Sequence, residues 1–80
     1  MMDVEKKILE VLVQFITTDI EPESINSESS LKNDLGIDSI SIIQILIILE
    51  EEFNIIFEEE EINGLREFGS LAECIKNKLE

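Results

Sequence analysis

The chain has 80 residues, of which 19 are acidic and 6 basic, and its formal net charge is -13 at pH 7 although 44% of its residues are hydrophobic. This length supports one domain, residues 1–80, with one modest core and little room for an enclosed active site. The hydrophobic content argues against disorder, and the negative charge favours protein partners with basic patches over nucleic acids or membranes.

The counts of cysteine and histidine restrict the chemistry further. Cys74 is the single cysteine and there is no histidine. An internal disulfide, a cysteine-based or histidine-ligated metal site and a Ser-His dyad are therefore all excluded, and we expect no catalytic residue and no metal. The N-terminus lacks the cationic and apolar segments of a signal peptide, so we expect a cytoplasmic protein.

Two segments precede the centre of the chain. Helical spacing of apolar residues predicts a first helix that begins after a cap at Asp3 and ends near Thr17 and Thr18, with a buried face of Val4, Ile8, Val11, Leu12 and Phe15. Residues 19–33 contain Pro22 and many small polar residues, which predict a long packed loop with one helical turn. Its apolar residues, and one just beyond it, are expected to tether it to the core: Ile20, Ile25, Leu31 and Leu35.

The stretch Asp34-Leu35-Gly36-Ile37-Asp38-Ser39-Ile40 leads from this loop into the most apolar segment of the chain. A serine at the start of a helix is usually an N-cap, but Asp38 is at least as good a cap. With Asp38 at the cap, Ser39 lies in the first turn with its hydroxyl free to face solvent. We therefore interpret Ser39 as a presented group.

Residues 40–49 include eight apolar residues in ten, which by β-branching alone would suit a strand. We predict a helix because the run continues through Phe53 without a breaker, for about fifteen residues. One face, including Ile43, Leu46 and Phe53, is expected to pack on the first and last helices. A second face is expected either to line a cavity or meet a partner, or to fill a core or a self-association surface, and it includes Ile42, Ile45 and Ile48.

The run Glu58 to Glu61 predicts the start of a short third helix, anchored by Ile62 and Leu65 and ended by Gly64. Four consecutive acids are usually a solvated helix start, and electrostatic docking is the functional alternative.

The last helix is predicted to follow a turn at Gly69, with Ser70 as its cap and Glu73 completing a capping box. Its buried stripe is expected to be Leu71, Ile75 and Leu79. Cys74 is interpreted as a small core or boundary residue rather than a reactive thiol.

The stretch from Asp34 to Ile40 resembles the signature of acyl carrier proteins, and the resemblance extends through Leu49-Glu50-Glu51-Glu52-Phe53 to Phe68-Gly69-Ser70-Leu71. It implies an all-α four-helix bundle with a long first loop and a short third helix. It also implies that the protein is not an enzyme but a carrier. In this family a phosphopantetheinyl transferase attaches 4'-phosphopantetheine from coenzyme A to the serine, here Ser39, and Asp38 is expected to take part in recognition by the transferase. The attached arm then carries acyl groups as thioesters.

The resemblance also implies a surface for acyl-transferring and acyl-modifying enzymes with basic docking patches. The residues expected on this surface are Ile40, Ile43, Gln44, Ile47, Glu50, Glu59 and Glu60. We expect a monomer, and the start at Met1 favours a free-standing carrier over one excised from a larger synthase.

The chain departs from the pattern of typical fatty-acid carriers, which have acids at the positions of Ser41 and Gln44 and often a proline at that of Phe57. The pathway therefore stays open between fatty-acid or polyketide-type biosynthesis and a peptidyl or D-alanyl carrier. Many peptidyl carriers have histidine at the position of Asp38. An unmodified acidic helical adaptor, binding partners through its apolar second helix, is the alternative from another class.

Overall fold

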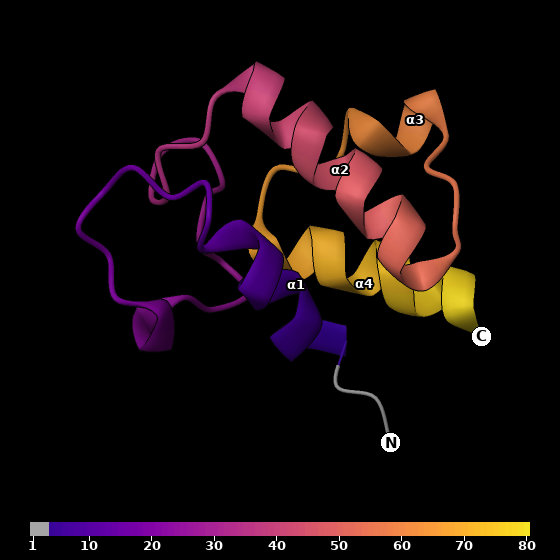
Figure 1. The fold of residues 1–80 in the computed structure, drawn as a ribbon, viewed down its shortest axis with the longest axis horizontal. Helices are drawn as coiled ribbons and strands as arrows, with labels where there is room; N and C mark the ends of the chain where they lie inside the picture. Colours follow the sequence, from indigo (N-terminus) through magenta and orange to yellow (C-terminus); the bar gives the residue numbers. More distant parts are fainter. Residues whose placement is uncertain (1–3) are drawn as a thin grey trace.

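The computed structural model describes residues 4–80, and within that range the fold is all-α, as predicted. The elements, in chain order, are α1 (Val4–Leu12), a 3-10 turn η1 (Pro22–Ser24), α2 (Ser39–Phe53), the short α3 (Glu59–Ile62) and α4 (Phe68–Leu79) (Figure 1). The expected long first loop with one helical turn is confirmed by η1. In this range the only β-type pairing is an isolated bridge between Ser30 and Glu67.

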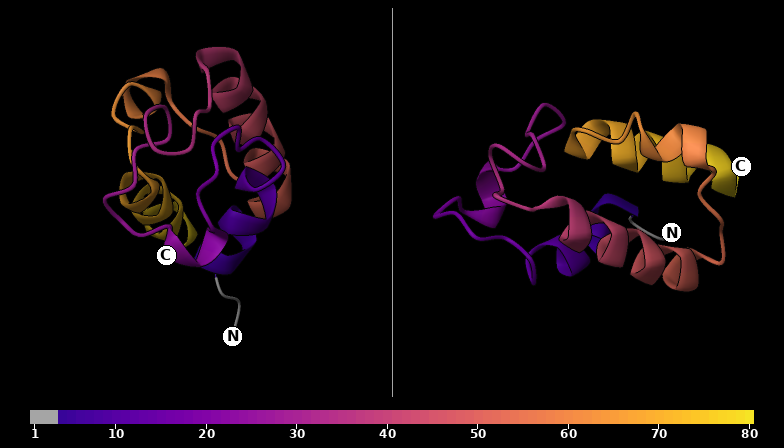
Figure 2. Two further views of the ribbon diagram at one scale, coloured as in Figure 1. Left: turned by 90° about the vertical axis from the view of Figure 1, so that its left-hand side faces the viewer. Right: turned by 90° about the horizontal axis from the view of Figure 1, so that it is seen from above.

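The helices surround one apolar core. Helix α1 packs against both α2 and α4, and the long connection from α1 to α2 gathers at one end of the molecule in the views of Figures 1 and 2. The helices contribute Ile8, Val11, Leu12, Ile45, Leu46, Leu49, Phe53, Phe68, Leu71, Ala72 and Ile75 to the core, and the connections contribute Leu31, Leu35, Ile37, Phe57 and Leu65. Burying each large side chain stabilises the fold by about 1.5–3 kcal/mol before the entropy of ordering is counted.

Helix α1 is shorter than predicted. It ends at Leu12, and hydrogen-bonded turns continue to Phe15, which is only half-buried. The predicted cap Asp3 lies outside the described residues. Thr17 and Thr18 do not end the helix; their hydroxyls instead hold the loop that precedes α2.

The predicted start of α4 is wrong. The helix begins at Phe68, so Gly69 and Ser70 lie in its first turn, and Glu67 at the N-cap position makes no side-chain cap. The backbone N–H groups of Phe68 and Gly69 donate instead to the carbonyls of Ser29 and Ser27, at 3.0 and 2.9 Å. Carbonyls of the first loop therefore satisfy the first backbone donors of α4, and no capping side chain is used.

Two side chains differ from prediction because they are partly exposed: Leu79, which was predicted to be buried, and Ile62, which was predicted to anchor α3. Leu79 is 40% exposed because it is the last residue of α4 and has no following turn to cover it, and Ile62 is 37% exposed. Leu65 is buried as predicted and fixes the segment that follows α3.

The prediction that Ile43 packs on the first and last helices is also wrong, since this side chain is 55% exposed. Leu46 and Phe53 are buried as predicted, together with Ile45 and Leu49. One helical residue advances about 100° around the axis, so a core face centred on these four residues leaves Ile43 on its flank. The C-cap of α2 is Asn54, which takes the left-handed conformation with φ 56° and donates its backbone N–H to the Glu50 carbonyl.

Candidate functional site

The segment before α2 is held by two buried side chains, Leu35 and Ile37, which are 0% and 1% exposed. Ser30 closes the loop locally, because its N–H donates to the Asp34 carboxylate at 2.7 Å and its carbonyl accepts from the N–H groups of Asp34 and Leu35. The Ile37 N–H donates to the Leu31 carbonyl at 2.9 Å. These contacts fix where the chain enters α2.

Gly36 lies between the two anchors in a conformation that requires glycine. Its φ is +68°, and a Cβ there would lie 2.2 Å from Thr17 Oγ1 and 2.9 Å from Thr18 Cγ2. The Thr17 hydroxyl donates to the Gly36 carbonyl and the Thr18 hydroxyl to the Asp34 carbonyl, both at 2.7 Å. The end of the α1 region is thereby joined to the loop at the point where a side chain has no room.

Asp38 is the N-cap of α2, as predicted. Its φ and ψ of -82° and 173° are extended, and its Oδ1 accepts from the Ser41 N–H at 2.8 Å. This backbone hydrogen bond, together with one from the Ser41 side chain, lowers the pKa of Asp38. Ser39 is consequently the first residue of α2, and it is exposed.

A hollow of about 560 Å³ lies beside Ser39, between the first loop, the start of α2 and the segment around α3. Its apolar lining comes from Leu31, Ile42, Ile43, Ile62 and Leu65, and its polar lining from Ser30, Lys32, Asn33, Ser39, Asn63 and Arg66. The hollow has room for a flexible group that is attached to Ser39 and extends toward α3. A second, shallower depression is lined by Lys32, Gly36, Ile37, Asp38 and Ser39.

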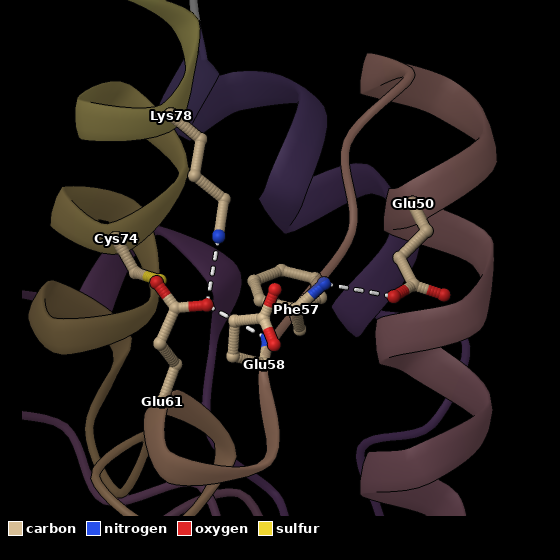
Figure 3. Close-up of polar contacts among 6 residues, drawn as sticks. All are labelled: Glu50, Phe57, Glu58, Glu61, Cys74 and Lys78. Atoms are coloured by element: carbon tan, nitrogen blue, oxygen red, sulfur yellow. Dashed lines mark hydrogen bonds and ion pairs between the residues drawn. The ribbon is translucent and has the colours of Figure 1, made fainter.

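Polar contacts tie α3 to α4 and Phe57 to α2 (Figure 3). The Glu61 carboxylate accepts from the Glu58 N–H and from Lys78 Nζ, each at 2.7 Å, and lies 3.7 Å from Cys74 Sγ. The hydrogen bond from Lys78 lowers the pKa of Glu61, and the same bond raises the pKa of Lys78. Glu61 is therefore not part of a merely solvated acidic run.

Cys74 is a half-buried boundary residue, in keeping with its interpretation from the sequence. Burial, and next the charge of Glu61, raise the pKa of its thiol. A raised pKa disfavours the thiolate, which is the reactive form.

The residues predicted to meet partners separate into two groups. Ile40, Ile43, Gln44 and Ile47 are exposed on the side of α2 that faces away from the core, with the three isoleucines 72%, 55% and 52% exposed. Glu59 and Glu60 are exposed on α3.

Glu50 differs from the rest of the predicted surface. It is half-buried, and its Oε2 accepts from the Phe57 N–H at 2.9 Å. This carboxylate therefore has a structural role: it holds the chain as it leaves α2.

Sequence reasoning missed Thr17, Thr18 and Arg66 as neighbours of the site. The threonines bind the glycine loop across 16 to 19 residues, and Arg66 reaches the hollow from the segment after α3. No periodicity marks such residues. Their signal is tertiary proximity alone.

Comparisons with known proteins agree with this geometry. A family model described as a phosphopantetheine attachment site matches residues 6–75. The chain is 36% identical over 76 residues to an acyl carrier protein of Buchnera aphidicola subsp. Baizongia pistaciae, with 95% of each chain covered. It is 28% identical over 79 residues to an acyl carrier protein of Porphyromonas gingivalis, with 99% of each covered. A solved structure of the acyl carrier protein from Enterococcus faecalis is similar with a TM-score of 0.80 and 25% identity, over 94% of this chain and 92% of that one.

The fold and the matched attachment-site model define a carrier of a covalently bound prosthetic group, and not an enzyme. The chain belongs to the acyl carrier protein family, and its cofactor is 4'-phosphopantetheine. Within residues 4–80, none of the helices combines the length and apolarity needed to cross a membrane.

Proposed function

We propose that Ser39 is the residue to which the 4'-phosphopantetheine arm is attached, and that the protein carries acyl intermediates in fatty-acid or polyketide-type biosynthesis. The observation that supports this most is the exposure of Ser39 at the first position of α2, directly after the N-cap residue Asp38. An exposed serine beside an open hollow suits a group that must be both attached and reached by other proteins. The arm, when bound, supplies a thiol that holds acyl groups as thioesters.

The chain's own residues contribute position and charge. Leu35 and Ile37 anchor the loop, so Ser39 is offered from a rigid point. Asp38 caps the helix by accepting from the Ser41 N–H, and its carboxylate places a negative charge next to Ser39 in the sequence. We propose that the phosphopantetheinyl transferase recognises this negative charge.

The exposed face of α2 is the proposed surface for the transferase and for acyl-handling enzymes. Ile40, Ile43 and Ile47 give it an apolar stripe, beside the amide of Gln44. Glu59 and Glu60 on α3 are the proposed contacts for basic patches, whereas Glu50 contributes mainly through its bond to Phe57. The apolar stripe supports partners that bury hydrophobic surface at this face.

The proposed setting is the cytoplasm, with the protein as a monomer and as one domain over residues 1–80. A chain with one free cysteine, Cys74, fits a reducing compartment. A peptidyl or D-alanyl carrier is the alternative assignment. The mass of the group released from the arm of protein purified from its own cells separates them: an acyl mass supports the first proposal, and an aminoacyl mass supports the alternative.

The attachment is tested by intact-protein mass after incubation with coenzyme A, magnesium and a broad-specificity phosphopantetheinyl transferase. We expect one phosphopantetheine-sized increment in the wild type and none in Ser39→Ala. Ser41→Ala is the matched control, because it removes a hydroxyl in the same helical turn and should retain the increment. An increment that persists in Ser39→Ala would refute the assignment, and no increment in folded wild type with several transferases would favour the adaptor.

Asp38 is tested with two substitutions. Asp38→Asn keeps a good cap but removes the charge, and Asp38→Ala removes both. If the transferase reads the charge, Asp38→Asn slows loading while leaving the melting temperature close to that of the wild type. Unchanged loading of Asp38→Asn would restrict Asp38 to its role as a cap.

A further inference from the structure

Two cations stand apart from the other basic residues of this acidic chain. Of the six lysines and arginines, Lys7, Lys76 and Lys78 form ion pairs with Glu52, Glu5 and Glu61, and Lys6 also has an interaction partner. Lys32 and Arg66 form no ion pair with any residue in the range 4–80. Both are exposed, and both line the hollow beside Ser39.

The two cations reach the hollow from different parts of the chain. Lys32 belongs to the first loop, whereas Arg66 precedes α4. The Leu31 N–H donates to the Arg66 carbonyl at 3.0 Å, next to the bridge between Ser30 and Glu67, so the backbones that carry the two side chains are joined. Their placement at one hollow is therefore fixed by the fold.

Lys32 lines both depressions to which Ser39 contributes, namely the hollow and the shallower depression that also includes Asp38. An arm on Ser39 adds a phosphodiester, with one negative charge, next to the Asp38 carboxylate on a chain of net charge -13. Such a charge is repelled by its surroundings unless a cation lies nearby. Lys32 is such a cation.

The hollow also extends beyond the phosphodiester. Its apolar side chains, among them Ile42, Ile62 and Leu65, suit the methylene groups of a short acyl chain, and Arg66 is one of its polar lining residues. A guanidinium pairs with a carboxylate through a bidentate geometry. An acyl group that ends in a carboxylate therefore matches this lining better than a purely hydrocarbon one.

Resting on the attachment proposed above, we propose that Lys32 and Arg66 make this hollow a site for an anion carried by the arm, either its own phosphodiester or a carboxylate on the acyl group. Both the phosphodiester and the carboxylate are anions that a lysine or an arginine can bind, but they predict different preferences for the acyl group on the arm. Phosphodiester binding holds the arm whatever it carries. Carboxylate binding selects acidic acyl groups.

The test uses full-length protein loaded with the bare arm, with a hexanoyl arm or with an adipyl arm, which has the same carbon count and a terminal carboxylate. Intact mass verifies loading before any other measurement. The variants are Lys32→Gln, Arg66→Gln and their combination, with Lys6→Gln as the charge-matched control on α1. Circular dichroism melts establish that each variant is folded.

Two readouts distinguish the sources. If the phosphodiester is bound, its ³¹P resonance in the bare-arm form shifts in Lys32→Gln or Arg66→Gln but not in Lys6→Gln. If the carboxylate is bound, hydroxylamine cleaves the adipyl thioester more slowly than the hexanoyl thioester. The expected ratio of the two rates is about two- to five-fold, the range that exposed ion pairs provide, and it disappears in the double variant. Added salt weakens either effect.

The outcomes are decisive in each direction. Either readout supports the proposal and names the source of the anion. If the loaded variants show neither a ³¹P shift nor a change in the adipyl-to-hexanoyl ratio beyond Lys6→Gln, the site is refuted while the attachment at Ser39 stands. If mass shows no loading of folded wild type, the attachment fails, and the anion site fails with it.

Discussion

Replacing Gly36 with alanine should destabilise the protein strongly, although it adds one methyl group. The left-handed backbone costs an alanine about 1–2 kcal/mol. The new Cβ would also lie 2.2 Å from Thr17 Oγ1, so Thr17 must move and give up the hydrogen bond from its hydroxyl to the Gly36 carbonyl. The new Cβ would also lie 2.9 Å from Thr18 Cγ2, so Thr18 must shift and weaken the hydrogen bond from its hydroxyl to the Asp34 carbonyl. Each lost hydrogen bond costs about 0.5–1 kcal/mol.

These contributions sum to about 2–4 kcal/mol, against a total stability on the order of 4–12 kcal/mol for 80 residues. Gly64→Ala is the matched control. Gly64 lacks a positive φ, and the nearest atom to its added Cβ would be the Glu61 carbonyl oxygen at 3.7 Å, which is ordinary contact. We expect Gly64→Ala to change stability by no more than about 0.5 kcal/mol.

Urea unfolding followed by circular dichroism measures both variants. Thr17→Ala provides a second check, because it removes the closest clashing atom, and Gly36→Ala should then cost less than in the wild-type background. Equal stability of Gly36→Ala and Gly64→Ala, within about 0.5 kcal/mol, would refute this account of the loop. Strict additivity with Thr17→Ala would refute the clash specifically.

Three further predictions concern charge. The lowered pKa of Asp38 means that its contribution to stability is present above the unfolded-state value near 3.8 and is lost as pH falls through the folded value. The melting temperature of wild type should therefore fall over that acidic range more than that of Asp38→Asn, and parallel curves would contradict this. Alkylation of Cys74 across a pH series should give a lower thiol pKa in Glu61→Gln, because the negative charge of Glu61 raises that pKa. The thiol pKa should be higher in Lys78→Met, because the positive charge of Lys78 lowers it. Shifts of the same sign in the two variants would count against this cluster. Finally, raising salt from about 0.01 M to about 0.1 M shortens the Debye length from about 30 to about 10 Å, and the net charge of -13 predicts a higher melting temperature, so a flat or falling one would oppose it.

The sequence by itself determined the features that depend on near neighbours. The cap at Asp38 is set by a bond to Ser41, three residues away, and it leaves Ser39 exposed at the helix start. Helical spacing predicted the buried residues of α1 at Ile8, Val11 and Leu12. Such signals are legible because their partners lie within one helical turn.

Only the tertiary structure decided which face of α2 meets the core. Nearly every position there is apolar, so periodicity identifies the core face poorly. The sequence placed Ile43 on the core face and Ile45 on a second face, whereas packing against α1 and the rest of the core buried Ile45 and exposed Ile43. Contacts distant in the chain likewise decided the start of α4. The N-terminal backbone donors of α4 are satisfied by carbonyls of the first loop, about forty residues earlier in the chain, and no local capping motif in the sequence predicts these partners.

The site divides in the same way. Its serine and cap are local, but the cations of the hollow are not, because Lys32 and Arg66 approach each other only through the pairing of the first loop with the segment before α4. Exposed charges have no hydrophobic periodicity to reveal their position, so their convergence follows from the path of the folded backbone.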